Sequence, residues 1–113
     1  MAWRLAALTI AALACSNAER DAGNRDPLAV KGERVYLNVC VACHHANPAE
    51  DGSVGPAIAG SSRELLEAKV VRGEYPPGYT PKRPSAAMPP FAYLADQIDA
   101  LHAFLDEANA EPQ

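Results

Sequence analysis

Cys40-Val41-Ala42-Cys43-His44 is the stretch that decides the fold of this 113-residue chain. Two thiols stand three positions apart, so that one turn of helix can present both to the same group, and a histidine follows directly. Three kinds of site use such residues: a covalently attached haem, a thiol redox pair and a metal centre. The remainder of the sequence decides among them.

The spacing favours haem. In Cys-x-x-Cys-His, each cysteine can form a thioether with one vinyl group of a single haem, and the histidine is then placed under the iron. A thioredoxin-like redox pair requires a βαβ context, which the sequence lacks. A zinc centre requires four ligands, and no second pair of Cys or His at metal spacing follows His44.

Residues 1–14 have the pattern of a secretory signal. Arg4 supplies a positive charge, and the uncharged apolar segment 5–14 is shorter than the roughly 20 residues that a membrane-spanning helix needs. Ala12-x-Ala14 is a small-residue cleavage pattern directly before Cys15, the third cysteine. The sequence therefore predicts an exported, periplasmic protein.

Two fates of Cys15 remain open. Leu13-Ala14-Cys15 resembles the lipobox of bacterial lipoproteins, in which the cysteine is lipid-modified, although Ala12 stands where leucine is usual. Lipid-modified Cys15 would anchor the protein to the membrane. The alternative is ordinary cleavage after Ala18, which removes Cys15. We expect residues 15–26, which are polar and without an apolar period, to form a flexible tether.

The length and net charge of the chain limit the functions that it can have. The length allows one small domain, which buries a limited core and would gain stability from a bound prosthetic group. The formal net charge of −4 argues against nucleic acid as a partner, because a basic patch would be needed.

The first helix is predicted over residues 27–38. Asp26 can cap its free N–H groups, and Pro27 is tolerated at the first helical position. Gly32 and Tyr36 are four residues apart and share a face. A glycine inside a helix costs up to about 1 kcal/mol, which indicates the close approach of another helix.

The later elements follow from breakers and periodicity. Residues 45–60 are rich in Gly and Pro and predict a loop. A short helix is predicted over 63–72, ended by Gly73. Residues 73–90 hold six prolines and predict a stiff extended loop. The last helix is predicted over 95–108. Leu94, just before it, and Ile98, Leu101 and Leu105 within it follow one another at intervals of four, three and four residues, which predicts one apolar face.

The order of these motifs resembles class I cytochrome c of bacteria. The segments that resemble the family are Gly32-x-x-x-Tyr36, Cys40-x-x-Cys43-His44, Gly55-Pro56-x-Ile58-x-Gly60 and Met88-Pro89-Pro90-Phe91. The resemblance implies an all-α fold with three main helices around one covalent haem c. It places the domain at residues 27–108 and leaves 109–113 as a tail. It also implies that Phe104 crosses over Gly32 and packs on Tyr36.

The resemblance assigns the haem site as well. Cys40 and Cys43 would attach the haem covalently, and His44 and Met88 would be the axial ligands of its iron. Met88 is one of two methionines, and the other is the initiator.

Two further residues are implied on the histidine side of the haem. The Pro56 carbonyl would accept a hydrogen bond from His44, and Ile58 would pack on the haem ring. We expect His45 and His102 to be exposed. Five residues are candidates for the haem propionates, with nothing in the sequence to choose among them: Arg72, Tyr75, Tyr79, Lys82 and Arg83.

The implied function is one-electron transfer, without enzymatic activity, to or from respiratory partners. These would be a terminal oxidase, a dehydrogenase or a quinol-oxidising complex. One alternative is a haem sensor or peroxidase-like enzyme with a displaceable Met88 and an acid–base residue over the iron. Another is a structural metal module built on Cys40, Cys43 and a histidine.

Overall fold

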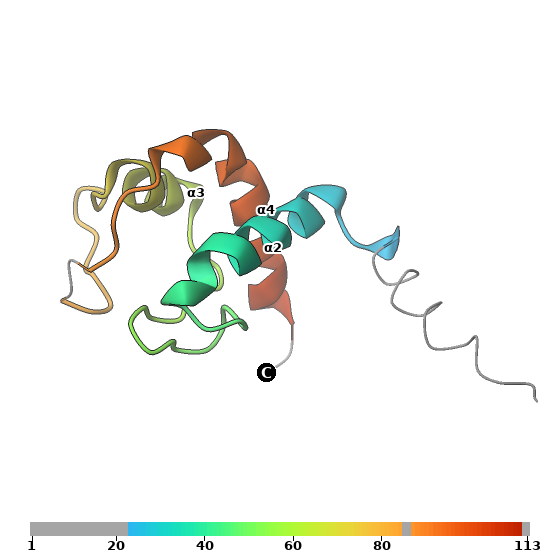
Figure 1. Cartoon of the computed structure of the whole chain (residues 1–113), viewed down its shortest axis with the longest axis horizontal. Coiled ribbons are helices and arrows are strands. Elements are labelled where there is room, and N and C mark those ends of the chain that lie inside the picture. The colour runs from blue at the N-terminus through green and yellow to red at the C-terminus, as the bar shows by residue number, and fades with distance from the viewer. Residues whose placement is uncertain (1–22, 85–86, 112–113) are drawn as a thin grey trace, which may run out of the picture.

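The computed structural model describes residues 23–84 and 87–111, and these residues form helices and loops without a strand. The predicted signal and Cys15 lie outside the described residues. Among the described residues, no helix is both long and apolar enough to cross a membrane. The elements in chain order are α2 (Pro27–Val39), the 3-10 turn η1 (Cys40–Ala42), α3 (Arg63–Leu66), the π turn η2 (Glu67–Val71), the 3-10 helix η3 (Ala92–Gln97) and α4 (Ile98–Ala110). Figure 1 shows α2 crossing α4.

Helix α2 begins as predicted. The Asp26 carboxylate accepts the Leu28 N–H at 2.9 Å, and Pro27 occupies the first turn, where no intrahelical N–H bond is lost. The helix ends at Val39, one residue beyond the predicted end, and η1 continues directly into the Cys-x-x-Cys-His motif. Helix α2 therefore carries the motif at its C-terminal end.

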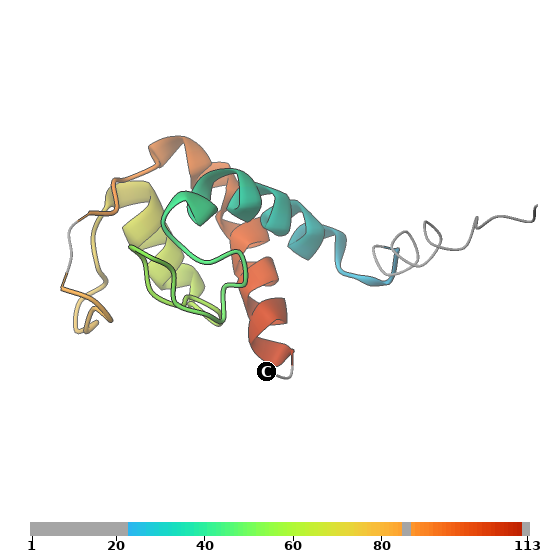
Figure 2. The same cartoon turned by 60° about the horizontal axis from the view of Figure 1, so that its bottom comes forward.

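The crossing of α2 and α4 depends on Gly32. A Cβ at this position would overlap the Ala100 carbonyl oxygen and lie 3.0 Å from the Leu101 nitrogen. The predicted close approach is confirmed, but the backbone over Gly32 is one turn earlier in α4 than the predicted Phe104. The Phe104 ring packs on Tyr36 as predicted, with centroids 5.4 Å apart. Figure 2 shows the same crossing after a 60° turn.

The hydrophobic core lies between α4, α2 and the α3–η2 segment. All four residues of the predicted apolar stripe are buried, with at most 6% of their surface exposed. Complete burial of such side chains contributes roughly 1.5–3 kcal/mol each. The largest fully buried side chains are Tyr36, Ile98, Leu101 and Leu105.

Two predicted helices differ in their winding. The segment predicted as one helix over 63–72 starts as α3, with the Ser62 hydroxyl capping the Leu65 N–H at 3.1 Å, and then widens into the π turn η2. The last helix starts earlier than the predicted residue 95, because residues 92–97 wind as 3-10 before α4 begins, and it ends at Ala110 rather than 108. Apolar spacing over so few residues does not distinguish α, π and 3-10 windings.

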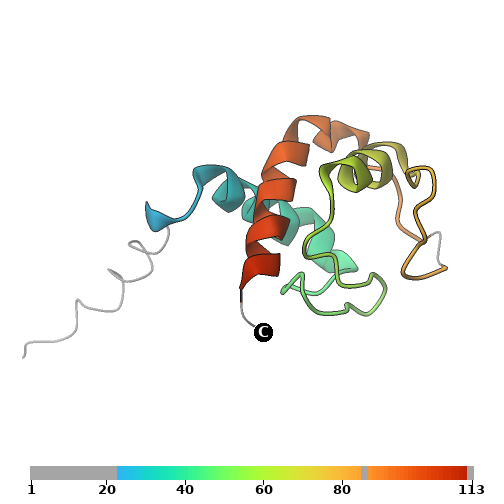
Figure 3. The same cartoon turned by 180° about the vertical axis from the view of Figure 1, so that it is seen from behind.

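The end of the predicted tether is fixed to the domain. Arg25 donates through Nε to Glu107 of α4 at 2.7 Å and through Nη1 to Glu33 of α2 at 2.6 Å. These carboxylates raise the pKa of the Arg25 guanidinium. Figure 3 shows α4 between residues 23–26 and the loops on the other side.

Candidate functional site

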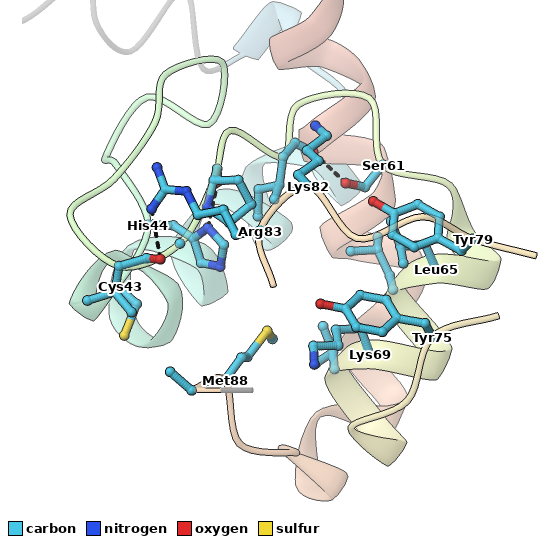
Figure 4. A pocket seen from close by; sticks show the side chains of 17 residues that line it. Cys43, His44, Ser61, Leu65, Lys69, Tyr75, Tyr79, Lys82, Arg83 and Met88 are labelled. Carbon is cyan, nitrogen blue, oxygen red and sulfur yellow. Dashed lines mark hydrogen bonds between the residues drawn. The ribbon is translucent and has the colours of Figure 1, made fainter. Parts of the chain in front are cut away.

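A cavity separates the two predicted ligand segments. Its empty volume, including the part open to solvent, is about 840 Å³. Cys43 and His44 line one side and Met88 another, and α3 and η2 add Leu66 and Val70. Figure 4 shows the His44 ring and the Met88 sulfur both pointing into this space.

The orientation of the His44 imidazole is fixed by two neighbours. Its Nδ1 lies 2.8 Å from the Pro56 carbonyl oxygen, which can only accept, so that Nδ1 carries the proton. Gly55 is buried against the ring, and a Cβ there would lie 2.5 Å from Nδ1 and 2.8 Å from Nε2. Nε2 is thereby left with a free lone pair, as a metal ligand requires.

The loop after His44 wraps closely around the motif turn. The Cys43 carbonyl accepts the N–H groups of Val54 at 3.3 Å and Gly55 at 2.9 Å. A Cβ at Gly52 would overlap the Cys43 carbonyl oxygen and lie 2.7 Å from the His45 nitrogen. The Gly and Pro content of residues 45–60 predicted a loop, but it did not predict that Gly52 packs against the motif. The sequence distance of Gly52 from the motif was the one feature that could have indicated this contact.

Both cysteines of the motif are free and half-buried. Cys43 lines the cavity, whereas Cys40 packs against the hydrophobic core beside it. Burial raises the pKa of the Cys40 thiol to about 11, above its ordinary value of 9.0.

Met88 is half-buried and packs against the core cluster. It stands in the Met88 strap, residues 87–91, whose two prolines follow it directly. The strap continues to Phe91, whose N–H donates to the Val70 carbonyl of η2 at 2.6 Å. The sulfur is therefore presented by a segment that the helix end holds in place.

The cytochrome c family profile matches residues 29–109. The chain belongs to the cytochrome c family. The comparisons with curated proteins and with solved structures returned no match. The match spans both predicted ligand segments and both helices of the crossing, and members of the family bind covalent haem c. This cytochrome c is thus a haem-based electron carrier of a kind that is typically exported.

The donor set of the cavity fits haem c. An imidazole with a free Nε2 and a thioether sulfur are the axial donors of Met/His haem proteins, and Cys43 is one of the residues that line the cavity. Within residues 23–84 and 87–111, no three His, Cys, Asp or Glu side chains form a cluster that could hold a metal ion.

The other two histidines of this cytochrome c do not line the cavity. His45 is exposed, as predicted, and its Nδ1 accepts the Asn47 N–H at 2.9 Å. His102 is half-buried on α4 rather than exposed, and its Nε2 lies 3.4 Å from Asp106.

Basic side chains join the two loops at the cavity rim. Arg83 donates to the carbonyls of Val54 at 2.8 Å and Gly52 at 3.2 Å, and Lys82 donates to Ala57 at 2.7 Å. These bonds connect the loop before Met88 to the loop after His44, and sequence reasoning did not identify them, because backbone acceptors leave no trace in side-chain patterns.

Four of the five propionate candidates line the cavity. Tyr75 and Tyr79 stack with centroids 5.4 Å apart, and Lys69 lies 4.3 Å above the Tyr75 ring. Arg72 is not among the lining residues and lies 3.5 Å from Glu67 and 3.7 Å from Glu74 instead.

Proposed function

We propose that this cytochrome c is a one-electron carrier whose haem iron is held by His44 and Met88, with Cys40 and Cys43 as covalent attachments. The observation that carries the proposal is that His44 and Met88, from segments 44 residues apart, direct an imidazole and a thioether into one cavity. When bound there, haem c supplies a one-electron couple, and Met/His ligation raises its potential.

The residues around the cavity hold the proposed ligands in position. Pro56 and Gly55 hold the His44 ring and its tautomer before any iron is bound. Ile58 lines the cavity on this side, where it would pack on the haem face. Two protein ligands leave no position for a substrate, and ligand segments held in place change little between redox states, which suits a carrier.

The visible spectrum of haem-loaded protein tests the ligands. We expect a low-spin reduced spectrum and the weak far-red ferric band of a methionine–iron bond. Met88→Ala should abolish that band, lower the midpoint potential and allow carbon monoxide to bind, whereas His45→Ala should change none of these. If the spectrum and potential of Met88→Ala match those of the wild type, Met88 is not a ligand.

A haem sensor or peroxidase-like enzyme is the alternative function. Acid–base catalysis over the iron most often uses a histidine, and among the described residues that line the cavity His44, the proposed iron ligand, is the one histidine. Carbon monoxide or cyanide binding to the wild type at neutral pH, without denaturant, would favour this alternative.

We further propose that the protein acts in the periplasm with respiratory partners: an oxidase, a dehydrogenase or a quinol-oxidising complex. The support is the signal-like pattern of residues 1–14, and Cys15 offers a lipid anchor. The mass of the purified mature protein tests both fates of Cys15. A lipid-modified N-terminal cysteine adds the mass of its acyl chains, and cleavage after Ala18 removes the cysteine.

A further inference from the structure

The Met88 strap is attached to a helix end just after its methionine. Pro89 and Pro90 have no backbone N–H, so that Phe91 is the first residue after Met88 that can donate one. This N–H donates to the Val70 carbonyl at 2.6 Å. The bond lies three residues from Met88.

The Val70 carbonyl is available because of how η2 ends. The last carbonyls of any helix lack intrahelical partners. In this turn the Gly73 N–H bonds to Lys69 at 3.1 Å and the Glu74 N–H to Ala68 at 3.0 Å, whereas Val70 is bound by Phe91. Val70 is buried, with 6% of its surface exposed, and a buried carbonyl without a partner is costly. The Phe91 N–H therefore gives the Val70 carbonyl a hydrogen-bond donor, and the same bond attaches the Met88 strap to the end of η2.

Gly73 adds a second contact to the same helix end. Its φ is +69°, a conformation that glycine adopts without strain. A Cβ on Gly73 would lie 3.3 Å from the Cβ and 3.4 Å from the Cδ of Pro90. The ring of Pro90 thus rests close to Gly73, two residues after Met88, and a larger residue would push it away.

We propose that the end of η2, through the Val70 carbonyl and Gly73, is a seat that positions Met88 and determines how readily Met88 leaves the iron. Val70 and Gly73 are positioning residues, because they act on Met88 through Pro90 and Phe91. The inference rests on the Met88 ligation proposed above, and it adds which part of the fold controls the strength of that ligand. Figure 1 shows the strap passing beside the α3–η2 segment before η3.

The chain offers a matched pair of glycines to test the seat. Gly73→Ala introduces a side chain at φ +69° and against Pro90. Gly78→Ala introduces the same strain at φ +80° in the same loop, but nothing lies within 4 Å of its Cβ. Both variants carry similar backbone strain, so that the contact with Pro90 is the feature that distinguishes them.

The measurement is the affinity of imidazole for the ferric haem-loaded protein, followed in the visible spectrum, because imidazole must displace Met88 to bind. We expect Gly73→Ala to bind imidazole about tenfold more tightly than the wild type, equivalent to ~1.4 kcal/mol. Gly78→Ala should stay within about twofold of the wild type, which is ~0.4 kcal/mol. Equal imidazole affinities in Gly73→Ala and Gly78→Ala would contradict the proposal.

Two further variants keep the test decisive. If Gly73→Ala does not mature, Pro90→Ala removes the Cγ and Cδ atoms of the ring that lies against Gly73, introduces no strain at Gly73, and should also tighten imidazole binding. Wild-type affinity in Pro90→Ala would then contradict the proposal. Met88→Ala separates the two proposals. If its ferric spectrum is unchanged, Met88 is not a ligand and both proposals fail. If its spectrum changes but Gly73→Ala behaves as Gly78→Ala, only the seat fails.

Discussion

At the scale of single residues, the position of the His44 ring depends on the lack of a side chain at Gly55. Gly55 has no Cβ, and the His44 ring occupies the space that a Cβ would take. The same ring is held by the Pro56 carbonyl. A methyl group at residue 55 therefore competes directly with the imidazole for its position.

We predict that Gly55→Ala displaces the His44 ring and breaks its bond to Pro56. Overpacking of this kind costs about 1–3 kcal/mol, and a displaced ring should weaken the histidine–iron bond. The measurements are the urea midpoint and the low-spin fraction of the haem spectrum. Gly23→Ala, with nothing within 4 Å of its Cβ, is the control. A wild-type spectrum in Gly55→Ala would contradict the packing described.

Tyr36 gives a prediction at alkaline pH. Burial, and secondly the neighbouring Cys40, raise the pKa of Tyr36 to about 12, above its ordinary value of 10. A raised pKa favours the protonated phenol in the folded state, so that this stability is complete below pH 10 and is lost as the pH rises through about 12. The Tyr36 hydroxyl also donates to the His45 carbonyl.

We therefore expect Tyr36→Phe to be less stable than the wild type at pH 7, by about 1 kcal/mol for the lost hydrogen bond. This difference should shrink between pH 10 and 12, because only the wild type loses the contribution of the phenol. Urea unfolding at several pH values is the measurement. Tyr93→Phe, at a residue that is 72% exposed, is the control. A constant difference across this pH range would show that Tyr36 does not titrate as described.

At the scale of elements, the α2–α4 crossing sets two opposing effects against each other at Gly32. Alanine raises helix propensity by up to about 1 kcal/mol relative to glycine. Its Cβ, however, would overlap the Ala100 carbonyl, which belongs to a helix backbone and cannot move aside alone.

We predict that the overlap dominates and that Gly32→Ala destabilises the fold by about 1–3 kcal/mol. Because α2 carries the haem motif at its end, the variant should also mature with less haem. Urea unfolding and haem yield are the measurements. Asn38→Ala, on an exposed face of α2, raises propensity without the overlap and should not lose stability. A stabilised Gly32→Ala would mean that the helices can separate freely.

The elements also show how far the sequence predicts this structure. The start of α2, the buried stripe of α4 and the Tyr36–Phe104 contact could be predicted, because capping residues and apolar periods are local signals and the family resemblance supplies the pairing. The His44–Pro56 bond came from the resemblance alone. The π turn η2 could not be predicted, because apolar spacing over so few residues does not distinguish helix windings. The Val70–Phe91 bond could not be predicted either, because it joins backbone groups 21 residues apart. The carbonyls that Arg83 and Lys82 bind were missed for the same reason.

At the scale of the whole molecule, residues 23–26 lie on one side of α4 and the loops that carry the predicted haem ligands on the other (Figures 1 and 3). Arg25 fixes the end of the N-terminal segment to α2 and α4 through Glu33 and Glu107. Its side chain is 32% exposed, so that water and salt still weaken these ion pairs. A change at Arg25 should therefore be felt at the N-terminal end and not at the haem.

We predict that Arg25→Gln loses about 1 kcal/mol of stability or less, as for other partly exposed ion pairs, and that the loss becomes smaller at high salt. Proteases should cut the segment before Pro27 faster in this variant, since its end is no longer held. The spectrum and potential should remain those of the wild type. Arg34→Gln, at an exposed arginine of α2, is the control. A shifted potential in Arg25→Gln would show that the α2–α4 crossing transmits strain to the cavity, whereas unchanged proteolysis would show that contacts other than these ion pairs hold the segment.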